Sequence, residues 1–163
     1  MGVALDTYDE ENGIHPRNKQ LPSKRLATAG LNVAYGLKSY PTNGPFPETW
    51  NVAALDDGYQ IDILYDQAFK WDPVESEGFY TCCLASVADC NSQSNQWTKL
   101  PEGSVSYSNK ALSMQLPACA TALAYMWEIT PVLGTKALPI YADDEFELPG
   151  APWIKELDKM LTE

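Results

Sequence analysis

The chain leads into its most clearly predicted helix with the stretch Gly13-Ile14-His15-Pro16-Arg17-Asn18-Lys19-Gln20, followed by residues 21–36. Pro16 disfavours a helical backbone at the residue before it, so we expect His15 in an extended segment just ahead of the helix. Pro22 is tolerated only in a first turn, which predicts a helix that begins within residues 18–23. Gly36 predicts where the helix ends.

One face of this predicted helix carries mostly small residues. They recur at helical spacing and are Leu26, Ala29, Gly30, Val33 and Ala34. Small side chains allow close approach, so we expect this face to pack against a sheet.

His15 is the only histidine in the sequence, and its imidazole is the one side chain that exchanges protons near neutral pH. The positive pole of the helix dipole favours the neutral imidazole, which is the form that a general base needs. Taken alone, a single histidine is more often a surface residue that flanks a helix than a catalytic group.

Further blocks of sequence follow in a defined order. They are residues 6–36 with the helix ending Ala34-Tyr35-Gly36; Phe79-Tyr80-Thr81-Cys82-Cys83 with Cys90 and Trp97; Ala122-Leu123-Ala124-Tyr125-Met126-Trp127; Leu138-Pro139-Ile140-Tyr141; and Leu148-Pro149-Gly150-Ala151-Pro152-Trp153. In this order the blocks resemble the sialate O-acetylesterase family, a branch of the SGNH hydrolases. The resemblance covers nearly the whole chain, and the block around His15 is its most specific part.

The resemblance implies a serine esterase that removes O-acetyl groups from sialic acids or another acetylated sugar, with His15 as general base. Many SGNH hydrolases place an aspartate three residues before this histidine, but Asn12 occupies that position here. Asp9 and Asp6 are therefore the candidate triad carboxylates, and a solvated acidic loop is the alternative for each. Arg17 is the candidate partner of the substrate carboxylate, with a solvated arginine at the helix start as its alternative.

The serine nucleophile is not visible in this chain. The sequence contains neither a G-x-S-x-G elbow nor a G-D-S-like block, so we expect the nucleophile on an N-terminal segment or a separate chain. The start MGVALDTYDEENG lacks a basic region followed by an apolar region, so no signal peptide is expected. Since the family is lysosomal or secreted, we interpret the chain as the C-terminal portion of a longer enzyme that is inactive by itself.

Composition limits the partners. With 163 residues and 45% apolar residues, the chain has the make-up of a packed domain. Its net charge of -11 argues against nucleic-acid binding and opposes an anionic sugar at long range. No apolar run approaches the roughly 20 residues that span a bilayer, so no membrane partner is expected.

The hydrophobic pattern changes to a period of two after residue 48. Residues 51–55, the turn Asp56-Asp57-Gly58 and residues 59–65 predict a hairpin. Further strands are expected at residues 79–83, 104–107, 112–116 and 120–127, and residues 153–161 predict a short helix or a frayed tail. The apolar residues 1–5 predict a last strand before the histidine loop.

These elements predict an α/β plus β architecture. Residues 1–38 are expected to be the last strand, loop and helix of an SGNH hydrolase domain, residues 39–48 a linker rich in proline and glycine, and residues 49–163 an accessory β-sandwich-like domain. The alternative is a separate β-rich module that binds carbohydrate or has a structural role, in which His15 is a relic.

The four cysteines are Cys82, Cys83, Cys90 and Cys119. An even number in a chain that resembles secreted enzymes favours two disulfides, of which three pairings are possible. Cys82 and Cys83 are adjacent in a predicted strand and point to opposite faces, so each is expected to have a different, distant partner. Because the sequence has no C-x-x-C pair, we expect neither a metal nor a cofactor.

Overall fold

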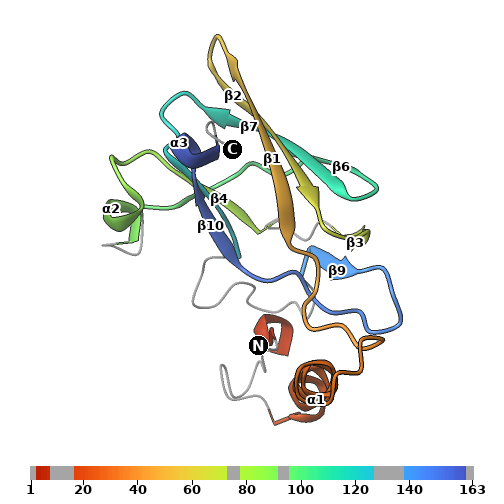
Figure 1. Cartoon of the computed structure of the whole chain (residues 1–163). Coiled ribbons are helices and arrows are strands. Elements are labelled where there is room, and N and C mark those ends of the chain that lie inside the picture. The colour runs from red at the N-terminus through yellow and green to blue at the C-terminus, as the bar shows by residue number, and fades with distance from the viewer. Residues whose placement is uncertain (1–2, 8–16, 73–77, 92–95, 127–137, 161–163) are drawn as a thin grey trace. The chain divides into compact units, whose positions relative to one another are not determined.

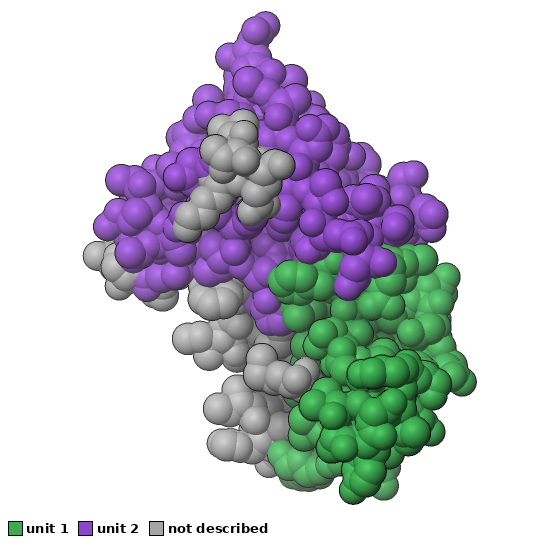
Figure 2. All heavy atoms as spheres, in the orientation of Figure 1, with its two compact units in different colours: residues 1–46, 67–72, 128–151 green, residues 47–66, 73–127, 152–163 purple. Residues whose placement is uncertain are grey.

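The computed structural model describes residues 3–7, 17–72, 78–91, 96–126 and 138–160 (Figure 1). The chain divides into two compact units, coloured separately in Figure 2. Unit 1 comprises residues 1–46, 67–72 and 128–151, and unit 2 comprises residues 47–66, 73–127 and 152–163. Unit 1 thus joins the N-terminal helix to two segments from later in the chain. The predicted linker at residues 39–48, between the SGNH hydrolase segment and the accessory domain, stays a prediction.

Unit 1 contains the predicted helix as α1 (Gln20–Tyr35). The side chain of Asn18 accepts a hydrogen bond from the Gln20 N–H at its start, with N and Oδ1 3.0 Å apart. Gly36 adopts a left-handed conformation with φ 70°, and its N–H donates to the Asn32 carbonyl. Because only glycine adopts this conformation at little cost, the chain leaves the helix here. The predicted start and end are both confirmed.

The small-residue face of α1 differs from the expectation of close packing on a sheet. Leu26 is 57% exposed and Val33 76% exposed, and a Cβ added at Gly30 would meet no atom within 4 Å. The buried positions of the helix are Arg25 and Thr28 instead. This face is exposed among the described residues, so its packing against a sheet of the parent domain stays a prediction, and the observed buried contact of the helix is the pair of Arg25 with Asp6.

The strand predicted over residues 1–5 is also wrong where the structure describes it. Val3 and Ala4 are irregular, and η1 (Leu5–Thr7) is a 3₁₀ turn. The Thr7 N–H and hydroxyl both donate to the Ala4 carbonyl, at 3.1 and 2.7 Å. This local turn satisfies groups that a strand would offer to a neighbouring strand.

Two short antiparallel strands of unit 1 were not predicted, namely β3 (Phe69–Trp71) and β9 (Ile140–Ala142). Each has three residues, which is too short to display a period of two. Phe69 and Ile140 are fully buried, so the strand pair carries the apolar core of this unit.

The described residues of unit 2 form two four-stranded antiparallel sheets and two short helices (Figure 1). The first has the order β1 (Pro47–Leu55), β2 (Gly58–Tyr65), β7 (Ala111–Pro117), β6 (Val105–Ser108). The second has the order β10 (Trp153–Glu156), β8 (Ala122–Tyr125), β4 (Phe79–Cys82), β5 (Thr98–Lys99). The prediction of a β-rich lobe is confirmed.

The predicted hairpin is present, with Gly58 in its second strand and not in the turn. Leu55 lies opposite Gly58, so Asp56 and Asp57 alone make the turn between β1 and β2. Gly58 lies so close to the Leu116 carbonyl that a Cβ at this position would clash with it. The alternating residues Ile61, Ile63 and Tyr65 are buried, as a strand with one apolar face requires.

Aromatic rings join the two sheets of unit 2. Trp50 of β1 and Trp153 of β10 meet edge to face, with ring centroids 4.9 Å apart. Phe79 and Tyr125 lie beside Trp153, at centroid distances of 5.9 and 6.0 Å. Such contacts add to the area that the rings bury.

The helix predicted over residues 153–161 is wrong in its first half. Residues Trp153–Glu156 form β10, which pairs with β8 so that Trp153 lies opposite Tyr125. Packing of the buried Trp153 overrides the helical pattern of the sequence around it. A single turn, α3 (Leu157–Met160), follows, and a second short helix, α2 (Val87–Asn91), was not predicted. No helix among the described residues is long and apolar enough to cross a membrane.

Candidate functional site

His15 and Asp9 fall within residues 8–16, which lie outside the described residues. Their roles as general base and triad carboxylate therefore stay predictions. Asp6 and Arg17 lie on either side of this segment, Asp6 buried in η1 and Arg17 exposed ahead of α1. The structure therefore describes Asp6 and Arg17 themselves, but not the segment between them.

Asp6 forms a buried ion pair with Arg25 of α1. Arg25 Nη1 lies 2.6 Å from Asp6 Oδ1, and Nη2 lies 2.7 Å from Oδ2. The side chains are only 5% and 3% exposed, respectively. Arg25 Nη1 also donates to the Val3 carbonyl at 2.8 Å. Two parallel charge-assisted hydrogen bonds are the most directional form of this interaction, so the pair holds residues 3–7 against the helix.

Tyr141 at the centre of β9 adds a third member to the pair. Its hydroxyl donates to Asp6 Oδ2 at 2.8 Å and accepts a hydrogen bond from the Leu138 N–H at 3.1 Å. Burial raises the pKa of the Tyr141 phenol well above its ordinary value, and the negative charge of Asp6 raises that pKa further. Tyr141 therefore stays protonated as a donor at neutral pH. We call Asp6, Arg25 and Tyr141 the Asp6 cluster.

A pocket of about 390 Å³ opens beside the Asp6 cluster within unit 1. Its charged lining includes Lys24, Arg25 and Lys70, against Asp6, Asp72, Glu145 and Glu147. Lys70 Nζ and Glu147 Oε1 form an exposed ion pair at 2.6 Å, whose hydrogen bond raises the pKa of Lys70 and lowers that of Glu147. Because acidic groups outnumber basic ones, the lining does not select for an anion.

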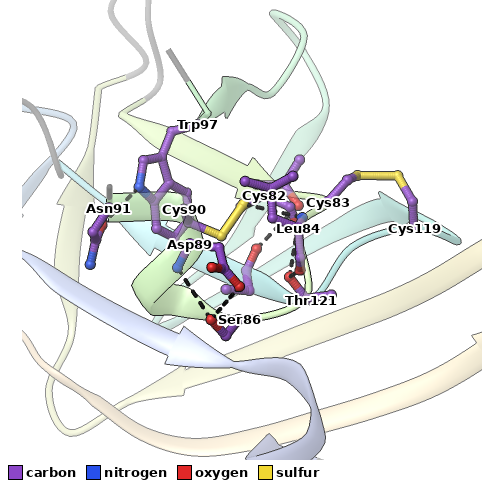
Figure 3. The surroundings of a disulfide bond; sticks show 12 residues. Cys82, Cys83, Leu84, Ser86, Asp89, Cys90, Asn91, Trp97, Cys119 and Thr121 are labelled. Atoms are coloured by element: carbon purple, nitrogen blue, oxygen red, sulfur yellow. Dashed lines mark hydrogen bonds between the residues drawn. A yellow bond between two sulfur atoms is a disulfide. The ribbon is translucent and has the colours of Figure 1, made fainter. Parts of the chain in front are cut away.

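The two disulfides of unit 2 join Cys82 to Cys90 and Cys83 to Cys119. Figure 3 shows them leaving adjacent residues in opposite directions. The prediction of two disulfides, with Cys82 and Cys83 in different ones, is confirmed, although Cys90 is a near partner, eight residues along the chain. All four cysteines are consumed in these bonds, so none serves as a thiol nucleophile.

Thr121 braces the backbone beside the disulfides. Its hydroxyl donates to the Leu84 carbonyl at 2.6 Å, and its N–H donates to the Cys82 carbonyl at 2.8 Å (Figure 3). Ser86 exchanges hydrogen bonds with Asp89, whose carboxylate accepts from the Ser86 hydroxyl at 2.6 Å. This arrangement caps α2, which makes Ser86 a structural serine.

Arg25 and Tyr141 were missed by the sequence analysis, although Asp6 was selected. Arg25 lies 19 residues after Asp6 and Tyr141 lies 135 residues after it, so no local spacing links the three. Two weak signals in the sequence could have indicated these residues. Arg25 lies on a helix that is otherwise rich in small residues, and Tyr141 lies within the Leu138-Pro139-Ile140-Tyr141 block. Among the residues that the structure describes, no three His, Cys, Asp or Glu side chains gather as metal ligands would.

Comparison with known proteins gives one consistent set of relatives. Residues 51–157 match the family model described as the sialate O-acetylesterase C-terminal domain. The chain is 28% identical to the sialate O-acetylesterase of Mus musculus over 163 aligned residues, which cover 96% of this chain and 28% of the relative. The Homo sapiens sialate O-acetylesterase is also 28% identical, covering 94% of this chain and 28% of the relative. The chain therefore spans 28% of the length of these two relatives.

Proposed function

Because the chain belongs to the family of sialate O-acetylesterase C-terminal domains, we propose that it is the C-terminal part of a carboxylic ester hydrolase that removes O-acetyl groups from sialic acids. The observation that carries this proposal is the extent of the similarity. The family match lies within residues 51–157, whereas the alignment to the mouse relative covers 96% of the chain and so includes the block around His15. The similarity thus joins the accessory lobe and the histidine block in one protein.

In the proposed reaction, His15 acts as the general base for a serine that this chain does not supply. The serine oxygen attacks the acetyl carbonyl carbon while its proton passes to the imidazole, and backbone N–H groups stabilise the oxyanion. The sugar oxygen then leaves with that proton, and the acetyl group stays on the serine. Water, deprotonated by His15, releases acetate and restores the serine.

We assign the triad carboxylate to Asp9 in preference to Asp6. Both oxygens of Asp6 already accept hydrogen bonds from Arg25, and one also accepts from Tyr141. A carboxylate held in this way is turned toward the helix and is a poor partner for an imidazole nine residues along the chain. Arg17, exposed at the other flank, is proposed to face the carboxylate of the sialic acid.

The proposed location is lysosomal or extracellular. The two disulfides support it because such bonds persist in oxidising compartments and are rare where thiols are kept reduced.

The test is hydrolysis of p-nitrophenyl acetate and of an O-acetylated sialic acid by the longest natural product that contains this chain. His15→Ala is expected to lower kcat on the order of 10⁴-fold, since loss of the base disables the triad as a unit. Tyr35→Phe is the control, because Tyr35 is 77% exposed on α1, and it is expected to keep full activity. Full activity of His15→Ala would overturn the proposal.

A further inference from the structure

Helix α1 contacts unit 1 through polar side chains at its buried positions. These positions are Arg25 and Thr28. The Arg25 guanidinium bonds the Asp6 carboxylate, and the Asn32 side chain donates a hydrogen bond to the Tyr40 carbonyl. An ion pair and hydrogen bonds therefore hold the side of the helix that faces its own unit.

The large apolar side chains of α1 are exposed instead. Leu26 is 57% exposed and Val33 is 76% exposed. Gly30 lies between them, four residues after Leu26 and three before Val33, so all three share one face of the helix. A Cβ added at Gly30 would meet no atom within 4 Å, so no described residue packs over the middle of this face. We call Leu26, Gly30 and Val33 the outer face of α1.

This arrangement is the reverse of the usual one for a surface helix. The apolar stripe of such a helix normally faces the core, and its polar residues face water. Large apolar side chains that are exposed among the described residues number nine, and four of them belong to α1, namely Leu21, Leu26, Val33 and Tyr35. Apolar surface that is concentrated in one place marks an interaction site, so we expect a partner to cover the outer face.

The relatives indicate what this partner is. Helix α1 precedes the matched C-terminal domain, residues 51–157. The alignment to the mouse relative covers 96% of this chain, and therefore includes α1, but it covers only 28% of the relative. Most of the relative thus consists of a part that this chain lacks. In the sequence, α1 lies between the C-terminal domain and that part.

A second copy of this chain is the competing occupant of the outer face. The chain has a net charge of -11, so two copies repel each other as they approach. A part of the same longer chain is tethered beside the helix, which raises its effective concentration. We infer that the outer face of α1 is the docking surface for the part of the longer ester hydrolase that carries the serine nucleophile. This inference rests on the proposed function.

The first test is hydroxyl-radical footprinting, in which exposed side chains are oxidised and then located by peptide mass spectrometry. It compares this chain with the longest natural product that contains it. Leu26 and Val33 are expected to be oxidised in this chain and severalfold less in the longer product. Tyr35 is the internal control, because it is 77% exposed and lies two residues after Val33, on another side of the helix. Its oxidation is expected to be equal in both proteins.

The second test uses two substitutions at positions with nearly equal exposure, 76% at Val33 and 77% at Tyr35. In this chain, Val33→Glu and Tyr35→Glu are both expected to leave the urea midpoint close to that of the wild type, as surface substitutions do. In the longer product, Val33→Glu places a carboxylate in an apolar contact, so it is expected to lower the urea midpoint and the esterase activity. Tyr35→Glu is expected to change neither.

Three outcomes would overturn the inference. Leu26 and Val33 are oxidised equally in both proteins, or their protection grows with the concentration of this chain alone, which would place a second copy on the outer face. The third is a longest natural product that adds nothing to this chain. Loss of activity in His15→Ala with an unprotected outer face would remove only the docking surface, whereas full activity of His15→Ala would remove the proposed function itself.

Discussion

Arg25 and Asp6, 19 residues apart in the sequence, form a two-pronged ion pair whose side chains are 5% and 3% exposed. Burial of this kind makes the consequence of a single substitution different from that of a double one. Removing one partner leaves the other buried without its opposite charge, whereas replacing both with apolar residues leaves no buried charge.

We therefore expect Arg25→Met to lower the free energy of unfolding by about 3–5 kcal/mol. The double variant Asp6→Leu with Arg25→Met is expected to lose much less. Urea denaturation followed by circular dichroism measures both. Lys70→Met is the control, because it breaks an ion pair at a similar distance between two exposed side chains and is expected to have no measurable effect. Equal losses in the single and double variants would contradict the account.

The sequence predicted those elements whose signal is local. The turn Asp56-Asp57-Gly58 between two strand-like runs indicated the hairpin, which the structure contains, although Gly58 pairs with Leu55 at the start of the second strand. Pro22 and Gly36 marked the ends of α1. These features depend on backbone geometry at one or two residues, which the sequence displays directly.

Features that depend on a distant partner were not predictable in this way. Residues 153–156 have the pattern of a helix, yet they form β10 because Trp153 is buried against Tyr125 of β8. In the sequence, Arg25 has the pattern of a solvated helix residue. Its burial depends on Asp6 and Tyr141, which are distant in the sequence. The candidate base, His15, lies outside the described residues, so its assignment depends on the similarity to the mouse relative, which covers 96% of the chain.

Tyr65 is expected to make the free energy of unfolding depend on pH in the alkaline range. Burial raises the pKa of this phenol far above its ordinary value of 10.0, an effect that the neighbouring Trp153 side chain only partly opposes. Below pH 10 the phenol is protonated in both the folded and the unfolded chain, so its contribution is constant. Above that pH the unfolded chain releases the proton while the folded chain retains it, and stability falls by up to about 1.4 kcal/mol per pH unit. Urea denaturation between about pH 10 and 12 measures this slope, and Tyr65→Phe is expected to flatten it. An equal slope in both proteins would refute the assignment.

The two disulfides are expected to differ in their access to reductants. Cys83 and Cys119 are exposed, whereas Cys82 and Cys90 are buried. Because exchange requires direct attack of a thiolate on sulfur, a limiting amount of dithiothreitol should open the Cys83–Cys119 bond first. Alkylation of the released thiols followed by peptide mass spectrometry identifies the bond. Release of Cys82 and Cys90 at the same rate or earlier would contradict the prediction.

The same bond should carry a large share of the covalent stabilisation. Cys83 and Cys119 are 36 residues apart, and a loop of this length predicts a loss of up to about 4 kcal/mol when the bond is absent. The loop closed by the Cys82–Cys90 bond spans only eight residues, so this bond is expected to contribute less to the free energy of unfolding. Urea denaturation of the paired variant Cys83→Ala with Cys119→Ala measures the loss.

Gly30 and Gly36, six residues apart on and just after α1, should respond in opposite directions to the same substitution. Gly30 is inside the helix, where a Cβ would meet no atom within 4 Å, so Gly30→Ala is expected to stabilise the protein by about 0.5–1 kcal/mol. Gly36 has φ 70°, which strains any residue with a Cβ, so Gly36→Ala is expected to destabilise it by about 1 kcal/mol. Thermal unfolding of the two variants measures both signs. A stabilising Gly36→Ala would show that the end of α1 does not require a left-handed glycine at this position. A destabilising Gly30→Ala would show that the small-residue face of α1 is covered in the folded protein.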